Sequence, residues 1–193
     1  MGFSFNRKRF KDLSEQEVLA LAISSEEDDA RIYRDYAERL RADYPDSAAV
    51  FDGMAAEEDE HRRLLIALHR DRFGEVIPLI RREHVSGYYA RRPVWLVKNL
   101  SLERIREEAA AMEQDAENFY RAAAARTTDA ATRQLLGDLA AAEAGHQDSA
   151  HDLSAQHLSE DNRSDEDSRA HRQFLLTWVQ PGLAGLMDGS VST

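Results

Sequence analysis

The stretch MAAEEDEH, residues 54–61, decides the fold because it places Glu58 and His61 three positions apart. Residues with this spacing lie on one face of an α-helix, so both side chains can bind one metal ion. The pair also falls within a helical series of apolar residues, at positions where core residues belong. That series runs Val50, Met54, Glu58, His61, Leu65 and Leu68. A carboxylate on a buried face is unfavourable unless it is paired or bound to metal, so the stretch predicts a metal-binding helix.

The same pattern occurs a second time in LAAAEAGH, residues 139–146, as Glu143 and His146. The offsets between the two copies are 143 − 58 = 85 and 146 − 61 = 85 residues. One Glu-x-x-His pair arises easily by chance in a glutamate-rich chain, whereas two pairs in matching context indicate an internal repeat. We therefore predict two copies of a helix hairpin, each of which supplies one such pair.

Each repeat also carries a glutamate on its first helix, Glu27 in the first copy and Glu113 in the second. Glu27 lies between Ile23 and Ala30 in the apolar series, and the offset to its counterpart is 113 − 27 = 86 residues. Four carboxylates and two imidazoles would then point into one bundle core, which is the ligand set of a di-iron or di-manganese carboxylate site. The candidate metal ligands and catalytic residues are Glu27, Glu58, His61, Glu113, Glu143 and His146. Tyr33 and Tyr120 are interpreted as core aromatics or as hydrogen-bonding partners of these ligands.

Capping and breaking signals predict four helices, over residues 15–43, 47–73, 102–126 and 130–158. The pattern Ser14-x-x-Glu17 is a capping box, Pro45 breaks the first helix, Gly74 ends the second and Ser101 caps the third. Thr127-Thr128-Asp129 is a turn and cap before the fourth helix. The connector 75–100, partly helical around 77–85, is long enough to run the length of the bundle. The expected fold is an all-α, ferritin-like four-helix bundle with a long crossover connection between helices 2 and 3. A connector of this length also permits a domain-swapped dimer.

Composition narrows the classes of partner and metal. The chain has 193 residues, a formal net charge of −11 and no cysteine. The acidic balance argues against nucleic acid as a partner, and the missing cysteines exclude thiolate zinc sites and iron–sulfur clusters. Oxygen-rich ligation with two imidazoles suits iron, with manganese as the alternative.

Four segments follow from these observations: a basic N-terminal lead-in at 1–13, a metal-binding domain at 14–158, an acidic linker at 159–170 and a C-terminal segment at 171–193. Within the last, residues 173–187 carry no formal charge but are fewer than the roughly 20 apolar residues that span a bilayer. The segment is interpreted as the start of a truncated membrane segment, or alternatively as an interfacial helix.

The six candidate ligands together resemble the rubrerythrin and erythrin branch of the ferritin-like superfamily, over residues 14–158. The tail QPGLAGLMDGSVST, residues 180–193, is similar to the first membrane segment of the vacuolar-iron-transporter family. The closest resemblance is to the membrane-bound ferritin type, in which an erythrin-like domain is fused to such a transporter. It implies two iron ions per site, with Glu27 and Glu113 as bridging ligands.

That resemblance implies a ferroxidase that oxidises Fe(II) with oxygen or hydrogen peroxide and serves a membrane iron transporter in iron efflux and protection from oxidative stress. It also implies a homodimer on the cytoplasmic side of the bacterial inner membrane. Two alternatives are a non-catalytic iron-sensing or dimerisation module and a rubrerythrin-like peroxidase with an external reductant. A plain helical dimer whose acidic core holds adventitious metal is a third. The chain departs from typical rubrerythrins at Ala116, where the family has a further glutamate, while Glu117 lies on a different azimuth.

Other charged residues are interpreted as surface groups. We expect a solvated acidic face formed by Glu26, Asp29, Glu57, Glu60 and Asp115. The histidines without a partner pattern are also expected on the surface, namely His69, His84, His151, His157 and His171.

Overall fold

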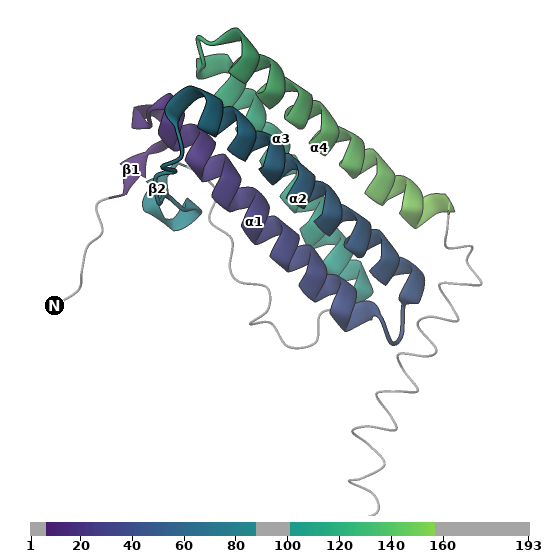
Figure 1. Ribbon diagram of the computed structural model, residues 1–193. Helices are drawn as coiled ribbons and strands as arrows, with labels where there is room; N and C mark the ends of the chain where they lie inside the picture. Colours follow the sequence, from purple (N-terminus) through teal and green to yellow (C-terminus); the bar gives the residue numbers. More distant parts are fainter. Residues whose placement is uncertain (1–6, 88–100, 157–193) are drawn as a thin grey trace, which may run out of the picture.

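The computed structural model describes residues 7–87 and 101–156, with side chains as far as residue 145. Four long helices make up most of this part of the chain (Figure 1). They are α1 Glu15–Leu40, α2 Pro45–Phe73, α3 Leu102–Arg126 and α4 Ala130–Gln156. The all-α, four-helix bundle predicted from the sequence is therefore confirmed.

The first two helices begin and end at local signals in the sequence. Ser14 Oγ accepts a hydrogen bond from the Glu17 amide at 3.2 Å, and Glu17 Oε2 accepts one from the Ser14 amide at 2.9 Å. This capping box fixes the start of α1. Helix α2 starts at Pro45, because the first helical position needs no amide donor. It ends at Gly74, whose φ of 83° is accessible to glycine at little cost.

The second pair of helices starts at side-chain caps. Ser101 Oγ accepts a hydrogen bond from the Arg104 amide at 3.2 Å, and α3 covers the predicted residues 102–126. Asp129 Oδ1 accepts from the Thr132 amide at 2.8 Å and so caps α4, as the sequence predicted. The short turn between the two helices makes them antiparallel neighbours.

Helices pack mainly within two hairpins, α1 against α2 and α3 against α4, and α1 also lies beside α3. At one end of the bundle, Arg126 of α3 donates to the Leu13 carbonyl, just before α1, at 2.9 Å. At the other end, Arg106 near the start of α3 donates to Ser47 of α2 at 3.1 Å. Helix α3 therefore starts at the end of the bundle opposite to that where α2 finishes.

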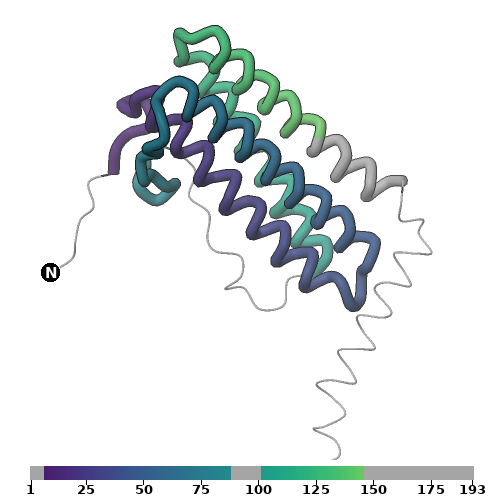
Figure 2. Tube along the Cα trace, viewed as in Figure 1, coloured from purple at the N-terminus to yellow at the C-terminus, as the bar shows by residue number. Residues whose placement is uncertain are grey.

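The described part of the connector returns to the N-terminal segment rather than forming the helix expected around 77–85. It contains one 3₁₀ turn, η2 Arg82–His84, followed by β2 Val85–Ser86. Strand β1 Lys8–Arg9 pairs with β2 in parallel, with Lys8 opposite Val85, and precedes a second 3₁₀ turn, η1 Phe10–Asp12. Figure 2 shows these two segments beside each other at one end of the bundle.

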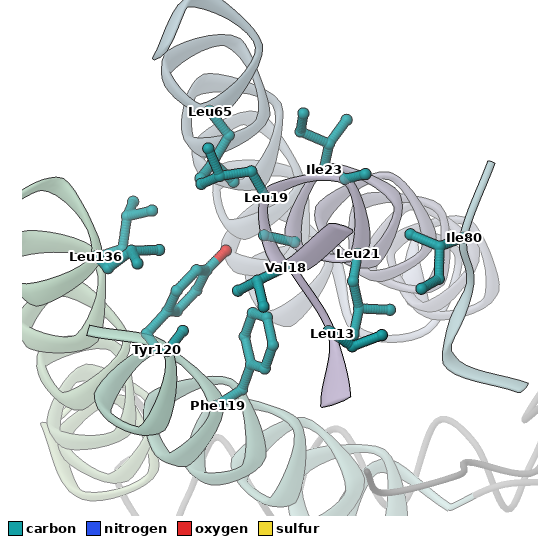
Figure 3. Close-up of a cluster of buried hydrophobic side chains, with 14 of the residues drawn as sticks. Leu13, Val18, Leu19, Leu21, Ile23, Leu65, Ile80, Phe119, Tyr120 and Leu136 are labelled. Atoms are coloured by element: carbon teal, nitrogen blue, oxygen red, sulfur yellow. The ribbon is translucent and has the colours of Figure 1, made fainter. Parts of the chain in front are cut away.

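Apolar side chains form two clusters at different heights in the bundle. The first lies at the end where α1 begins; Figure 3 shows Leu19, Leu65, Tyr120 and Leu136 among its members. The second lies at the other end and includes Tyr36, Phe51, Leu102 and Ile105. The buried carboxylates Glu26, Glu58 and Glu113 occupy sequence positions between the two clusters on their helices, and Glu143 follows the α4 members of the first cluster.

Among residues 7–87 and 101–156, no helix combines the length and the apolar character needed to cross a bilayer. The acidic linker and the C-terminal segment that the sequence assigns to 159–193 lie outside the described residues.

Candidate metal centre

Three helices bring four potential ligands together in the bundle core. They are Glu26 of α1, Glu58 and His61 of α2, and Glu143 of α4. Each offers one ligand atom, and these atoms all lie within 4.8 Å of one another. The exposed fractions of Glu26, Glu58 and Glu143 are 2%, 3% and 1%, so water cannot solvate their charges. Buried acids this close require protons or a cation.

The His61 imidazole lies among three carboxylates. Its Nδ1 atom is 3.2 Å from Glu143 Oε1, 3.6 Å from Glu58 Oε2 and 3.7 Å from Glu26 Oε2. Burial alone would lower the pKa of His61, but the surrounding carboxylates raise it to about 12. The imidazolium is thus the positive charge that balances the acids when no metal is bound.

Retained protons on the carboxylates reduce the remaining negative charge of the cluster. Burial, reinforced by the neighbouring Glu26, raises the pKa of Glu58 well above its usual range. Burial also raises the pKa of Glu143 to about 9, with Glu113 contributing. Burial opposes ionisation of Glu26 too, yet hydrogen bonding with Glu58 and His61 lowers its pKa. Glu26 is therefore ionised at neutral pH, whereas Glu143 holds a proton there and Glu58 keeps its proton to a higher pH than an ordinary glutamate.

Two buried tyrosines connect the hairpins through the carboxylates. The Tyr33 hydroxyl of α1 donates to Glu113 Oε1 of α3, and the Tyr120 hydroxyl of α3 donates to Glu26 Oε1 of α1. Burial, followed by the charge of the carboxylate each one contacts, raises the pKa of both tyrosines well above 10. Both phenols therefore stay protonated and act as donors, and each one orients an acid on the opposite hairpin.

Most of the ligands proposed from the sequence reach the core. Glu58, His61 and Glu143 belong to the cluster, and Glu113, which is 1% exposed, lies beside it through its interactions with Tyr33 and Glu143. His146 lies on α4, but its side chain is outside the described part of the chain.

The structure does not bring the predicted ligand Glu27 into the cluster. Its side chain is 32% exposed and forms ion pairs with Arg31 and, at 3.4 Å, with Arg62. Glu26 occupies the core position instead, because one residue along a helix is a rotation of 100°. Both glutamates fit the apolar spacing between Ile23 and Ala30, so that spacing cannot distinguish them.

A second signal in the sequence does distinguish the two glutamates. Glu113 precedes Tyr120 by 120 − 113 = 7 residues, and Glu26 precedes Tyr33 by the same number, 33 − 26 = 7. Glu27 precedes Tyr33 by only six. An alignment of the repeats on the glutamate–tyrosine interval would have selected Glu26, and the reciprocal hydrogen bonds explain why that interval matters.

Two further residues expected on the surface, Asp29 and His69, are buried, and so is Glu117. Asp29 forms a bidentate pair with Arg82 of the connector, which also donates to Ser25 Oγ at 3.1 Å. His69 is fully buried against Phe73, because it continues the apolar face of α2 one turn beyond Leu65. Glu117 is 5% exposed, and it accepts a hydrogen bond from Gln114 at 2.8 Å and pairs with Arg121 at 2.5 Å.

Comparison with known proteins identifies the class to which this bundle belongs. The geometry defines a ferritin-like helical bundle with a buried carboxylate–histidine site. The family model named Rubrerythrin matches residues 17–154, about 70% of the chain, and the chain belongs to the rubrerythrin family. No curated protein and no solved structure matches it.

Proposed function

We propose that the chain is a di-iron module that binds two Fe(II) ions and oxidises them with oxygen or hydrogen peroxide. The observation that carries the proposal is the convergence of Glu26, Glu58, His61 and Glu143 in the core, with Glu113 beside them. Four carboxylates can balance the four positive charges of two divalent ions in a poorly hydrated interior. The family match supports the same assignment, and manganese is the alternative ion.

The donor set fits iron on an observation independent of the family. Glu26 Oε2 is buried, and its 3.7 Å distance from His61 Nδ1 is longer than an ordinary hydrogen bond. A buried carboxylate oxygen in this state is costly, and a cation would relieve it. Glu26, Glu58, His61, Glu113 and Glu143 would hold the two ions, and His146 is proposed as a further ligand.

The residues of this chain have three proposed tasks. The four carboxylates and His61 bind the ions and, in doing so, release the protons that Glu58, Glu143 and His61 hold without metal. Tyr33 and Tyr120 orient Glu113 and Glu26 through hydrogen bonds. Bound iron supplies one-electron redox chemistry. Oxidation of two Fe(II) by hydrogen peroxide consumes two protons and gives two water molecules, and by oxygen it gives one hydrogen peroxide.

The wider role that we propose is to serve a membrane iron transporter in iron efflux and oxidative-stress protection. In this proposal the domain is a homodimer on the cytoplasmic side of the bacterial inner membrane, attached through the segment at 171–193. The support is the similarity of residues 180–193 to a transporter segment.

Anaerobic titration with Fe(II) tests the central proposal. We expect about two Fe(II) per chain and rapid oxidation when oxygen or peroxide is added. The variant Glu58→Ala/Glu143→Ala removes one carboxylate from each hairpin and should abolish both. Glu27→Gln is the matched control, because Glu27 lies outside the cluster. Oxidation at the wild-type rate in the double variant would refute the proposal.

The family match also favours a second function, that of a peroxidase that turns over with an external reductant. The chain has no cysteine and so no rubredoxin-type centre of its own to supply electrons. Steady consumption of hydrogen peroxide with catalytic iron and an added reductant would support this function. If the reaction instead stops once the bound Fe(II) has been oxidised a single time, the result would support the ferroxidase.

A further inference from the structure

A cavity of about 100 Å³ lies at the end of the bundle where α1 begins and α3 ends. Its apolar wall comes from both hairpins and is formed by Leu13, Val18, Leu19, Ala123 and Leu136. Figure 3 shows Val18 and Leu19 on α1 facing Tyr120 and Leu136 on the other hairpin. The cavity is separate from the metal cluster, since none of its lining residues belongs to that cluster.

The charged residues at this cavity already have partners. The Arg126 guanidinium donates to the carbonyls of Phe10, Lys11 and Leu13, the last two at 3.0 and 2.9 Å. Glu15 Oε1 lies 2.9 Å from Arg72 Nη1. A charged ligand would have to replace one of these interactions, so the cavity favours a neutral one.

One polar group of the lining remains to be satisfied. Thr127 is 8% exposed, and its Oγ1 is buried without a hydrogen-bond partner among the described residues. The backbone of Thr127 is already engaged, because its amide caps α3 on the Ala123 carbonyl and its carbonyl accepts from Arg133 at 3.2 Å. With φ −78° and ψ 139° the residue is extended. Thr127 lines the cavity, so a ligand hydroxyl can pair with Oγ1 there without displacing a hydrogen bond of the protein.

We propose that this cavity binds a small neutral amphipathic molecule, an alcohol or a phenol, whose hydroxyl pairs with Thr127 and whose apolar part lies against Val18, Leu19 and Leu136. An engineered apolar cavity of about 150 Å³ in another protein accepts benzene, so the smaller cavity here cannot enclose a whole benzene ring. Because it is partly open to solvent, an aromatic ring can enter it in part, with its hydroxyl group at Thr127. Its binding requires no metal.

Titration of the metal-free full-length protein with phenol tests the proposal, followed by NMR of ¹³C-labelled methyl groups. We expect saturable shifts at Leu13, Val18, Leu19 and Leu136. The methyl groups of Ile32, Leu40 and Ile105, in the other apolar cluster, serve as the internal control and should not move. Absence of saturable shifts at the cavity methyl groups would overturn the proposal.

Two variants separate the role of the hydroxyl from that of the cavity. Thr127→Val keeps the shape but removes the hydroxyl, so phenol should bind about tenfold more weakly while toluene binds as before. Ala123→Leu fills the cavity and should abolish binding of both probes, with an unchanged or raised melting temperature. Equal phenol affinity in Thr127→Val and wild type would overturn the proposed recognition of a hydroxyl. Because no metal is present, failure here would leave the proposed iron chemistry unaffected.

Discussion

The two hairpins repeat one pattern of ligands but support it in different ways. In the first, the acid Asp29, next to the site, pairs inside the protein with Arg82, a residue 53 positions away. In the second, Glu117 pairs with Arg121, one turn along the same helix, and that arginine is 67% exposed. The repeat therefore determines which residues face the core, whereas the residues outside the repeat determine how each hairpin is held.

Removal of Arg82 should have the largest effect on stability. Arg82→Met leaves Asp29 buried without its partner, which costs about 3–5 kcal/mol in the free energy of unfolding. Arg121→Met in the second hairpin should cost less, because its guanidinium is exposed and the buried Glu117 keeps the hydrogen bond from Gln114. Urea unfolding of both variants gives the comparison. The double variant Arg82→Met/Asp29→Asn should recover part of the loss, and no recovery would mean that the pair is not the cause.

The tyrosines test whether the hairpins are equivalent at the site. Tyr33→Phe and Tyr120→Phe each remove one hydrogen bond to a buried carboxylate on the other hairpin, and each should cost about 1.5–3 kcal/mol. We expect similar losses in urea unfolding of the metal-free protein. A loss confined to one variant would show that only one of the two reciprocal bonds contributes.

Substitution of the adjacent glutamates on α1 tests most directly which of the two binds metal. Glu26→Gln should weaken Fe(II) binding about 10- to 100-fold, since a negatively charged ligand is lost from the buried cluster. Glu27→Gln should leave the affinity unchanged, because that side chain pairs with Arg31 and Arg62. Competition with a coloured chelator under anaerobic conditions measures both. The reverse order of affinities would restore Glu27 as the ligand.

The pH dependence of the metal-free protein should report the protons held in the core. The pKa of Glu143 is raised to about 9 and that of His61 to about 12. Between pH 6 and 8 the folded state therefore binds more protons than the unfolded state. Its stability should fall as pH rises, by up to about 1.4 kcal/mol per pH unit for each such proton. Urea unfolding at several pH values measures the slope, and Glu143→Gln should reduce it. Stability that increases over this range would contradict the assignment.

Sequence patterns were sufficient to predict helix starts and candidate site residues wherever a local signal or a repeated signal was present. The capping residues Ser14, Ser101 and Asp129 gave the helix starts, because a cap acts through neighbouring residues. The duplicated Glu-x-x-His pairs gave Glu58, His61 and Glu143. Long-range contacts left no such signal. Arg82 resembles a surface charge in the sequence, and only the return of the connector to α1 brings it to Asp29.

The choice between Glu26 and Glu27 could be made only in part from the sequence. Apolar spacing defines an arc of the helix about as wide as one residue's rotation, so neighbouring positions both satisfy it. The interval to Tyr33 carried the missing information, but its meaning depends on a contact with α3 that only the three-dimensional arrangement supplies. The burial of His69 was not predicted for a related reason. A lone histidine on an apolar face belongs to no sequence pattern that shows whether it is buried.

The arrangement of the helices in hairpins also has a kinetic consequence. Most packing joins helices that are neighbours in the chain, so each hairpin can form from local contacts before the two associate. The cluster draws Glu26, Glu58 and His61 from one hairpin and Glu143 from the other, so it is completed only when they dock. Interactions that form late in folding act mainly on the unfolding rate. An ion bound there would lengthen the lifetime of the folded bundle while leaving the rate of hairpin formation almost unchanged.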